Sequence, residues 1–358
     1  MSSCHFQIAE ANSLPRGVFS TRLAARMERM HRFGSFGVLM LFLVLLNGCA
    51  TGGDRLSSTA TTNAEPQSYM RLAHPTADTV ALQIALRRFV PSKGNGPVVW
   101  LSGASHLGES NYFALLQQHL DKQALVLFEG VGAKSKKMRF DPDEEVSIQH
   151  TMATALGLVF QLSAIDYDRP RFRNSDMTIA QLQQILAGGG RGAGGSQGGA
   201  SAEFQELLQV MDGSSVLGSL MHIGLKFIGS NPKLQAMTKV LLIEILGQLK
   251  GDMSQLQGVP PEIQQLLEVI IRERNKVVMD DLKAEVRSFG APRSISIFYG
   301  AGHMVDLEKR LRGELNYRPK GEMWLTAISV NTREAGLSDL ELGTMRSLIQ
   351  WQMDALQP

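Results

Sequence analysis

Apolar residues in the first half of the chain alternate between short β-branched runs and helical spacings. The run at 97–101 is apolar and β-branched, which predicts a buried strand. From 110 to 120 the apolar positions recur at helical spacing, and 124–128 is a second apolar run that ends at Glu129. A strand, a helix and a strand in this order predict the unit of a parallel sheet that is covered by helices.

The C-terminal part of the chain repeats this order. Its pattern predicts a strand at 294–299, a helix at 305–315 and a strand at 323–330. When the two parts are aligned on their turns, Gly103-Ala104-Ser105-His106 coincides with Gly300-Ala301-Gly302-His303. We therefore expect an α/β fold of two quasi-duplicated strand–helix halves, which form a mixed, largely parallel sheet.

A large helical insertion is expected between the halves, at about 176–258. Thr178 and Gln181 have the spacing of a capping box that opens a helix. Residues 188–200 are mostly glycine and are expected to form a disordered loop. The apolar, Met-rich helices of the insertion favour ordinary core, but a partner surface or a cap over an active face stays open. Helices are predicted at 143–158, 205–211, 216–228 and 234–249, and from the Pro260-Pro261 pair through 286.

The first 48 residues have the pattern of a secretory signal. Several arginines precede an apolar run at 36–46, which is shorter than the roughly 20 residues that span a bilayer. The segment Leu46-Asn47-Gly48-Cys49 follows, and a cysteine in this place is typical of the lipobox of bacterial lipoproteins. We expect Cys49 to carry the acyl chains that anchor the protein. An ordinary transmembrane anchor is the alternative.

The rest of the chain is then a tether at 49–80 and a domain at 81–358. Ala50, rather than an aspartate, follows Cys49, which favours an outer-membrane lipoprotein that faces the periplasm. The only cysteines are Cys4 and Cys49, so the mature fold cannot depend on disulfides. Without 1–48 the chain has 31 basic and 32 acidic residues and no basic block, which argues against nucleic-acid binding.

Candidate chemistry gathers where the predicted strands end. His106, His303 and Glu129 each follow a strand, and the carboxyl edge of a parallel sheet is where ligands bind. Gly103, Gly300 and Gly302 permit a tight exit and a close approach of the backbone. Two imidazoles and a carboxylate suit manganese, cobalt or zinc. The alternative is that both histidines cap helices or bond the backbone.

A hydrolytic site would also need a base and a group that stabilises negative charge. Glu109 lies three residues after His106 and could act as the general base towards a metal-activated water. Arg274 lies on the predicted long helix and could stabilise developing negative charge. A salt bridge on the helix face is the alternative role for Arg274.

Several short motifs resemble the TraB/GumN/Tiki family over about 90–330, excluding the glycine-rich insertion. They are the segments 102–113 and 126–131, Gln161, 166–168, 174–176, the Arg274-Asn275 pair and 298–304. The wider superfamily includes metal-dependent proteases, erythromycin-esterase-like hydrolases and haem-binding lipoproteins. The resemblance implies roles for His106, His303 and Glu129, and a substrate contact for Arg274.

Some residues depart from the family pattern and leave the function open. Leu107 follows the first histidine where many relatives have glycine, and Met304-Val305-Asp306 replaces the usual continuation of the second turn. The leading hypothesis is a metal-dependent hydrolase of a peptide, amide or ester bond. The alternatives are a non-catalytic lipoprotein that binds haem, metal or a peptide, and an envelope interaction protein. Fold analogy alone cannot choose among them.

Overall fold

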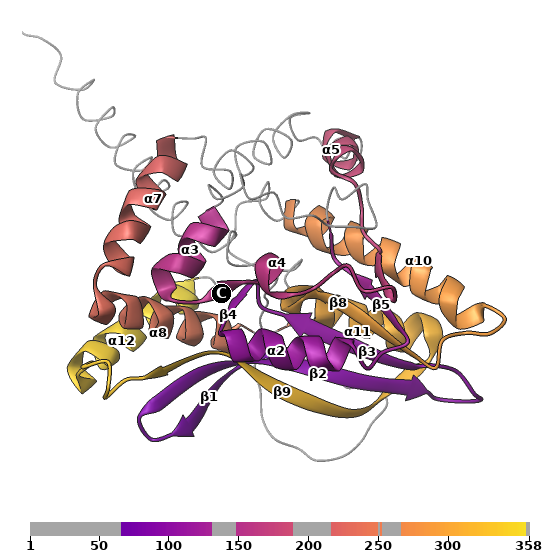
Figure 1. The fold of residues 1–358 in the computed structure, drawn as a ribbon, viewed down its shortest axis with the longest axis horizontal. Coiled ribbons are helices and arrows are strands. Elements are labelled where there is room, and N and C mark those ends of the chain that lie inside the picture. The colour runs from indigo at the N-terminus through magenta and orange to yellow at the C-terminus, as the bar shows by residue number, and fades with distance from the viewer. Residues whose placement is uncertain (1–65, 131–147, 189–215, 250, 253–265, 356–358) are drawn as a thin grey trace, which may run out of the picture. The chain divides into compact units, whose positions relative to one another are not determined.

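The computed structural model describes residues 66–130, 148–188, 216–249, 251–252 and 266–355 (Figure 1). Seven strands form one sheet, and β4 and β6 form a small second one. The strands are β1 (Met70–Thr76), β2 (Thr79–Pro91), β3 (Val98–Ala104), β4 (Leu107–Gly108), β5 (Leu125–Phe128), β6 (Val159–Phe160), β7 (Phe172–Asn174), β8 (Ser294–Gly300) and β9 (Tyr317–Asn331).

The main sheet is mixed and largely parallel, as the sequence predicts. Its order is β1-β2-β3-β8-β5-β7, and β9 pairs with β2. β3, β8, β5 and β7 are neighbours in this order and pair in parallel. Only β2 runs in the opposite direction, because it pairs antiparallel with β1, β3 and β9. Each half of the chain therefore contains a strand, a helix and a second strand of the same direction.

Helices cover both faces of the sheet. Ser102 bonds to a histidine of α2, while Arg87 forms a buried ion pair with Glu308 of α11. Arg87 pairs with Leu101 in the sheet, and neighbouring residues of a strand point to opposite faces, so α2 and α11 lie on opposite faces. The helices are α2 (Ser110–Leu120), α3 (Ile148–Leu156), α4 (Gln161–Ala164), α5 (Ile179–Gly188), α7 (Val216–Gly229), α8 (Pro232–Gln248), α10 (Arg274–Arg287), α11 (Met304–Leu315) and α12 (Asp339–Ala355).

The helical insertion supplies α5, α7 and α8 within the described residues. The predicted capping box is present, because Thr178 Oγ1 accepts from the Gln181 N–H and Gln181 Oε1 accepts from the Thr178 N–H. α8 packs closely on β1, where a Cβ on Gly247 would lie 2.5 Å from the backbone nitrogen of Leu72. α7 and α12 both contact α8, and the three lie together at the left of Figure 1.

The tether expected at 49–80 was wrong at its C-terminal end, because 70–76 forms β1. Its five paired positions add it to an edge of β2, and Tyr69 just before it is buried. Neither α12 nor the strand β2 was predicted from the sequence. The predicted signal peptide, Cys49, the glycine-rich loop, the helix at 205–211 and the Pro260-Pro261 start lie outside the described residues. No described helix is long and apolar enough to cross a membrane.

Candidate functional site

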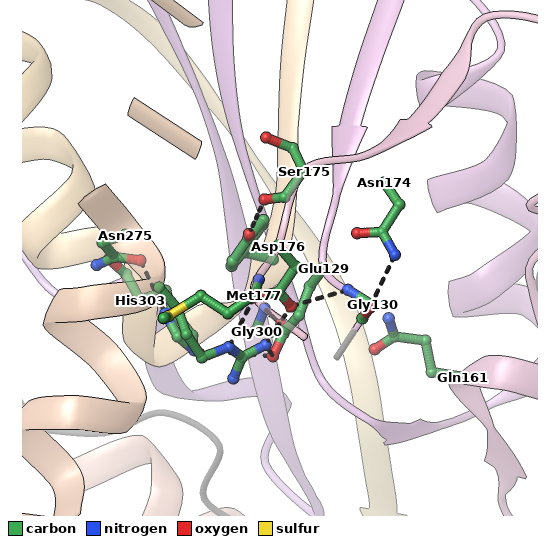
Figure 2. A network of polar contacts seen from close by, with 12 residues as sticks. Glu129, Gly130, Gln161, Asn174, Ser175, Asp176, Met177, Asn275, Gly300 and His303 are labelled. Carbon is green, nitrogen blue, oxygen red and sulfur yellow. Dashed lines mark hydrogen bonds and ion pairs between the residues drawn. The ribbon is translucent and has the colours of Figure 1, made fainter. Parts of the chain in front are cut away.

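The site is built at the carboxyl ends of four neighbouring parallel strands. His106 follows β3, His303 follows β8, Glu129 follows β5 and Asp176 follows β7. Because the strands run side by side in that order, their ends lie at one edge of the sheet, where open α/β sheets bind ligands. Figure 2 shows Glu129 between His303 on one side and Gly130 and Asn174 on the other.

Arg274 joins the two carboxylates of this edge. Its Nε and Nη2 donate to Asp176 at 3.0 and 2.7 Å, and Nη2 also donates to Glu129 Oε1 at 2.6 Å. Arg274 is only 2% exposed to solvent. Burial alone would lower the pKa of Arg274, but the two carboxylates raise it above its ordinary value. The guanidinium is therefore a fixed charge that positions Glu129 and Asp176, and the helix-face salt bridge that was the alternative role does not apply.

Glu129 is an ionised carboxylate in a buried place. Its Oε2 accepts the backbone N–H of Gly300 at 2.7 Å. Burial would raise its pKa, but Arg274, the two imidazoles and this N–H outweigh burial and lower the pKa to about 2. Oε1 accepts from Arg274 and Oε2 accepts from Gly300, and a carboxylate oxygen has two lone pairs, so acceptor capacity remains on both.

His303 is completely buried, and its two ring nitrogens have different surroundings. Nδ1 lies 2.8 Å from Asn275 Oδ1. Nε2 has no hydrogen-bond partner and lies 3.8 Å from Glu129 Oε1. Burial is the main cause that lowers the pKa of His303 to about 4, against the attraction of Glu129. The ring is therefore neutral near pH 7, and Nε2 faces the site unpaired.

His106 reaches the same edge from the first half. Its Nε2 is buried without a hydrogen-bond partner, although the residue as a whole is half-buried. Burial and Arg274 lower the pKa of His106, while Glu129 and the side chain of Gln161 raise it, so these groups share one electrostatic environment. The pairing of β4 with β6 brings Gln161 beside it, where the Gln161 N–H donates to the carbonyl of His106 at 2.8 Å.

The turn glycines differ in what they do. A Cβ on Gly103 would lie 3.1 Å from the carbonyl oxygen of Ala85 and 3.2 Å from Ile84, so the close approach expected there is present. Gly300 has a φ of −50°, which any residue adopts, and it serves instead through the N–H that it donates to Glu129. Gly302 is buried in the 3-10 turn η5 (Ala301–His303), and nothing in the structure shows a need for glycine there.

Glu109 is not directed at this site. Its Oε1 accepts both the N–H and the hydroxyl of Ser329 on β9, each at 2.7 Å. Glu109 precedes α2, and its own N–H donates to Ala327 of β9, so both ends of the residue are held to that strand. The role of general base expected for Glu109 therefore has no support in the structure.

The residues fit a divalent cation in part. Two atoms that each bind one zinc ion at about 2.0–2.2 Å lie about 3.3–3.6 Å apart at a tetrahedral angle, and at most about 4.4 Å apart when they face each other across the ion. The 3.8 Å between His303 Nε2 and Glu129 Oε1 is within this limit, and the unpaired Nε2 of His106 is a third donor of the right type. Among the described residues, however, no group of three or more His, Cys, Asp or Glu side chains is arranged to hold a metal ion.

Three residues of the site were not assigned a role from the sequence. Asp176 follows a strand of three residues, Asn275 bonds to His303, and Gln161 lies beside His106. Each lies in a segment that carries the family resemblance, which is the one signal that could have pointed to them. Their partners are more than 25 residues away along the chain, so spacing does not reveal the contacts.

Comparison of the chain with protein-family models, with curated proteins and with solved structures found no match. The resemblance to the TraB/GumN/Tiki family stays a prediction that rests on the motifs alone.

Proposed function

We propose that this chain is a metal-dependent hydrolase of a peptide, amide or ester bond. The observation that carries the proposal is the pair of buried Nε2 atoms, of His106 and His303, that have no hydrogen-bond partner beside an ionised Glu129. A buried polar atom without a partner costs about 1–3 kcal/mol, which a bound cation would offset. His106, His303 and Glu129 would hold manganese, cobalt or zinc.

A metal in this place would supply a nucleophilic water near neutral pH and would polarise a carbonyl. The protein's own residues prepare the site for that chemistry. Asp176 and Arg274 fix the position of the Glu129 carboxylate, and burial keeps both imidazoles neutral, which is the form that binds a metal. We no longer propose Glu109 as the base, because its carboxylate is directed at Ser329.

The proposal includes the place of the protein in the cell. Residues 1–48 would be the signal peptide, and acylated Cys49 would anchor the protein to the outer membrane, facing the periplasm. Mass spectrometry of the purified mature N-terminus tests this, because a mass without acyl chains on Cys49 would contradict it. Cys49→Ser should move the protein from the membrane fraction to the soluble fraction.

One observation favours a second candidate, a lipoprotein that binds a ligand without turnover. Glu129 already accepts hydrogen bonds from Arg274 and Gly300, and Glu109, the base expected from the sequence, bonds to Ser329 instead. A metal ion that is bound without turnover would satisfy the two Nε2 atoms. A peptide that donates hydrogen bonds to them would do so equally well. Haem is less well supported, because a macrocycle on His303 Nε2 would occupy the place of Glu129, only 3.8 Å away.

Hydrolysis tests the leading proposal. The full chain, stripped with a chelator and then reloaded with manganese, cobalt or zinc, is assayed on quenched fluorescent peptides and on simple esters. We expect activity that depends on the added metal, is lost in His303→Ala and is kept in His74→Ala, where an exposed histidine is removed. Metal binding without hydrolysis of any substrate would favour the second candidate.

A further inference from the structure

Asn275 connects the buried imidazole of His303 to two charged residues of α11. Its Oδ1 lies 2.8 Å from His303 Nδ1, and its Nδ2 donates to the carbonyl of His303 at 3.2 Å and to Asp306 Oδ2 at 2.8 Å. The same Asp306 oxygen accepts from Arg310 Nε at 2.6 Å. Asn275 and His303 are both 0% exposed, so water does not replace these partners. The result is a chain of hydrogen bonds that ends on the ring.

The chemistry of the partners fixes the orientation of the Asn275 amide. A rotated amide would place Oδ1 against the Asp306 carboxylate and the His303 carbonyl, and two acceptors would then face one another in a buried place. Such an arrangement leaves buried groups without partners and is costly. Arg310 Nε donates to Asp306 Oδ2 and so holds the Asp306 side chain in this position. Asn275 therefore presents its oxygen, and not its nitrogen, to Nδ1 of the His303 ring.

This orientation determines which ring nitrogen of His303 carries the proton. An amide oxygen accepts, so Nδ1 must donate, and the neutral ring then has a bare lone pair on Nε2. Ionised Glu129, 3.8 Å from Nε2, favours the other tautomer, because a carboxylate would accept a hydrogen bond from an Nε2–H. The shorter contact at Nδ1 opposes this preference.

We propose that Asn275 is a positioning residue that holds His303 in the Nδ1–H tautomer and so keeps the Nε2 lone pair directed into the site. Asp306 and Arg310 act through Asn275 by fixing its amide. The use of this lone pair as a metal ligand rests on the proposed function, whereas the tautomer itself does not. Outer partners of this kind orient metal-binding histidines in many proteins.

Two consecutive residues at the start of α10 contact different groups of the site, and the backbone before them explains how. Arg274 and Asn275 are consecutive, yet Arg274 bonds to Glu129 and Asp176 while Asn275 bonds to His303. They begin α10 directly after the π-helical turn η4 (Val269–Glu273). Wide turns of this type are common at functional sites, because they redirect the residues around them.

The tautomer can be observed directly by nitrogen NMR on the full chain labelled with ¹⁵N-histidine and freed of metal with a chelator. A protonated and a bare ring nitrogen have clearly different ¹⁵N shifts. The signal of His303 is assigned by its loss in His303→Ala, among the eight histidines of the chain. His119 of α2 is the internal control for folding, because its Nε2 bonds to Ser102 of β3.

We expect His303 to be protonated on Nδ1 in the native chain and to shift towards Nε2–H in Asn275→Ala, because Glu129 then faces no competing acceptor. Asp306→Ala, which removes the acceptor of Asn275 Nδ2, should give a mixture of the two tautomers. Glu314→Gln is the matched control, since Glu314 contacts Arg310 at 3.6 Å and is not a partner of Asn275 within the described residues, and it should change nothing. The signal of His119 should stay the same in all variants.

Two results would overturn the inference: an Nε2–H tautomer in the native chain, or an unchanged His303 signal in both Asn275→Ala and Asp306→Ala. If Asn275→Ala fails to fold, an unchanged signal in Asp306→Ala alone overturns it. The proposed function fails separately, because a chain with the expected tautomers that binds no manganese, cobalt or zinc would keep this inference and lose the metal.

Discussion

The two Gly-x-x-His turns come from matching halves of the chain, but their imidazoles have different surroundings. His303 is completely buried, and Asn275 of α10 is bonded to its Nδ1. His106 is half-buried, and the short β4–β6 pairing places Gln161 beside its backbone. The difference arises from the distant segment that packs against each turn and not from the turn itself. In the proposed metal site, the second half would provide a fixed ligand and the first half an adjustable one.

The largest expected effect comes from Arg274, whose guanidinium pairs with both Glu129 and Asp176. Arg274→Met should lower the free energy of unfolding by about 3–5 kcal/mol, because it leaves buried Glu129 and Asp176 without their cation. Urea denaturation measures this. Arg272→Met, two residues earlier, removes the partner of a more exposed pair with Glu268 and should cost less than about 1 kcal/mol. Equal losses of stability in the two variants would contradict the role of Arg274 as the cation shared by Glu129 and Asp176.

The next effect is the pH dependence of stability that His303 contributes. Its pKa is about 4 in the folded chain and about 6.5 when unfolded, so between these values the unfolded state binds the proton and the folded state does not. This contribution is complete above pH 6.5 and is lost as the pH falls towards 4, about 3 kcal/mol in total.

His303→Gln should flatten the loss of stability between pH 6.5 and 4, as measured by chemical denaturation at each pH. His74→Gln, at an exposed position, should leave the curve unchanged. Glu129 contributes to the loss of stability only below about pH 4.5, at the lower end of this window, since its pKa is lowered from 4.5 to about 2. An identical slope in native chain and His303→Gln would show that His303 is not held neutral by burial.

The smallest effect is expected for Glu109→Gln. The amide oxygen of glutamine can still accept from Ser329, so stability should change by less than about 1 kcal/mol. Metal binding and any hydrolysis should stay at the native level, because Glu109 is directed at β9. A large loss of hydrolysis with unchanged stability would restore the catalytic role that the geometry does not support.

Periodicity in the sequence predicted the elements that carry the site, and it did so for local reasons. The helix from Ser110 to Leu120 and the strand at the start of the second turn follow from apolar spacing, which depends on neighbouring residues. β1 was not predicted because most positions of 70–76 are exposed, so the sequence shows no sign of a strand there. Its pairing with β2 is a contact that only the fold shows.

The site was predictable to the extent that strand ends converge. His106, Glu129 and His303 follow directly from this rule and the order of the strands. Asn275 and Glu109 show where the rule stops. The direction of each side chain depends on a partner more than 25 residues away, which is His303 for Asn275 and Ser329 for Glu109. Tertiary packing sets such contacts, and a single sequence does not record them.

Metal content tests the central claim most directly. The full chain is dialysed against cobalt(II), freed of unbound metal and analysed for bound ion, together with His303→Ala, His106→Ala and His74→Ala. The account predicts one ion per native chain and per His74→Ala chain, none in His303→Ala and affinity weakened at least about ten-fold in His106→Ala. A native chain that binds no ion, or equal binding in His303→Ala and His74→Ala, would contradict it.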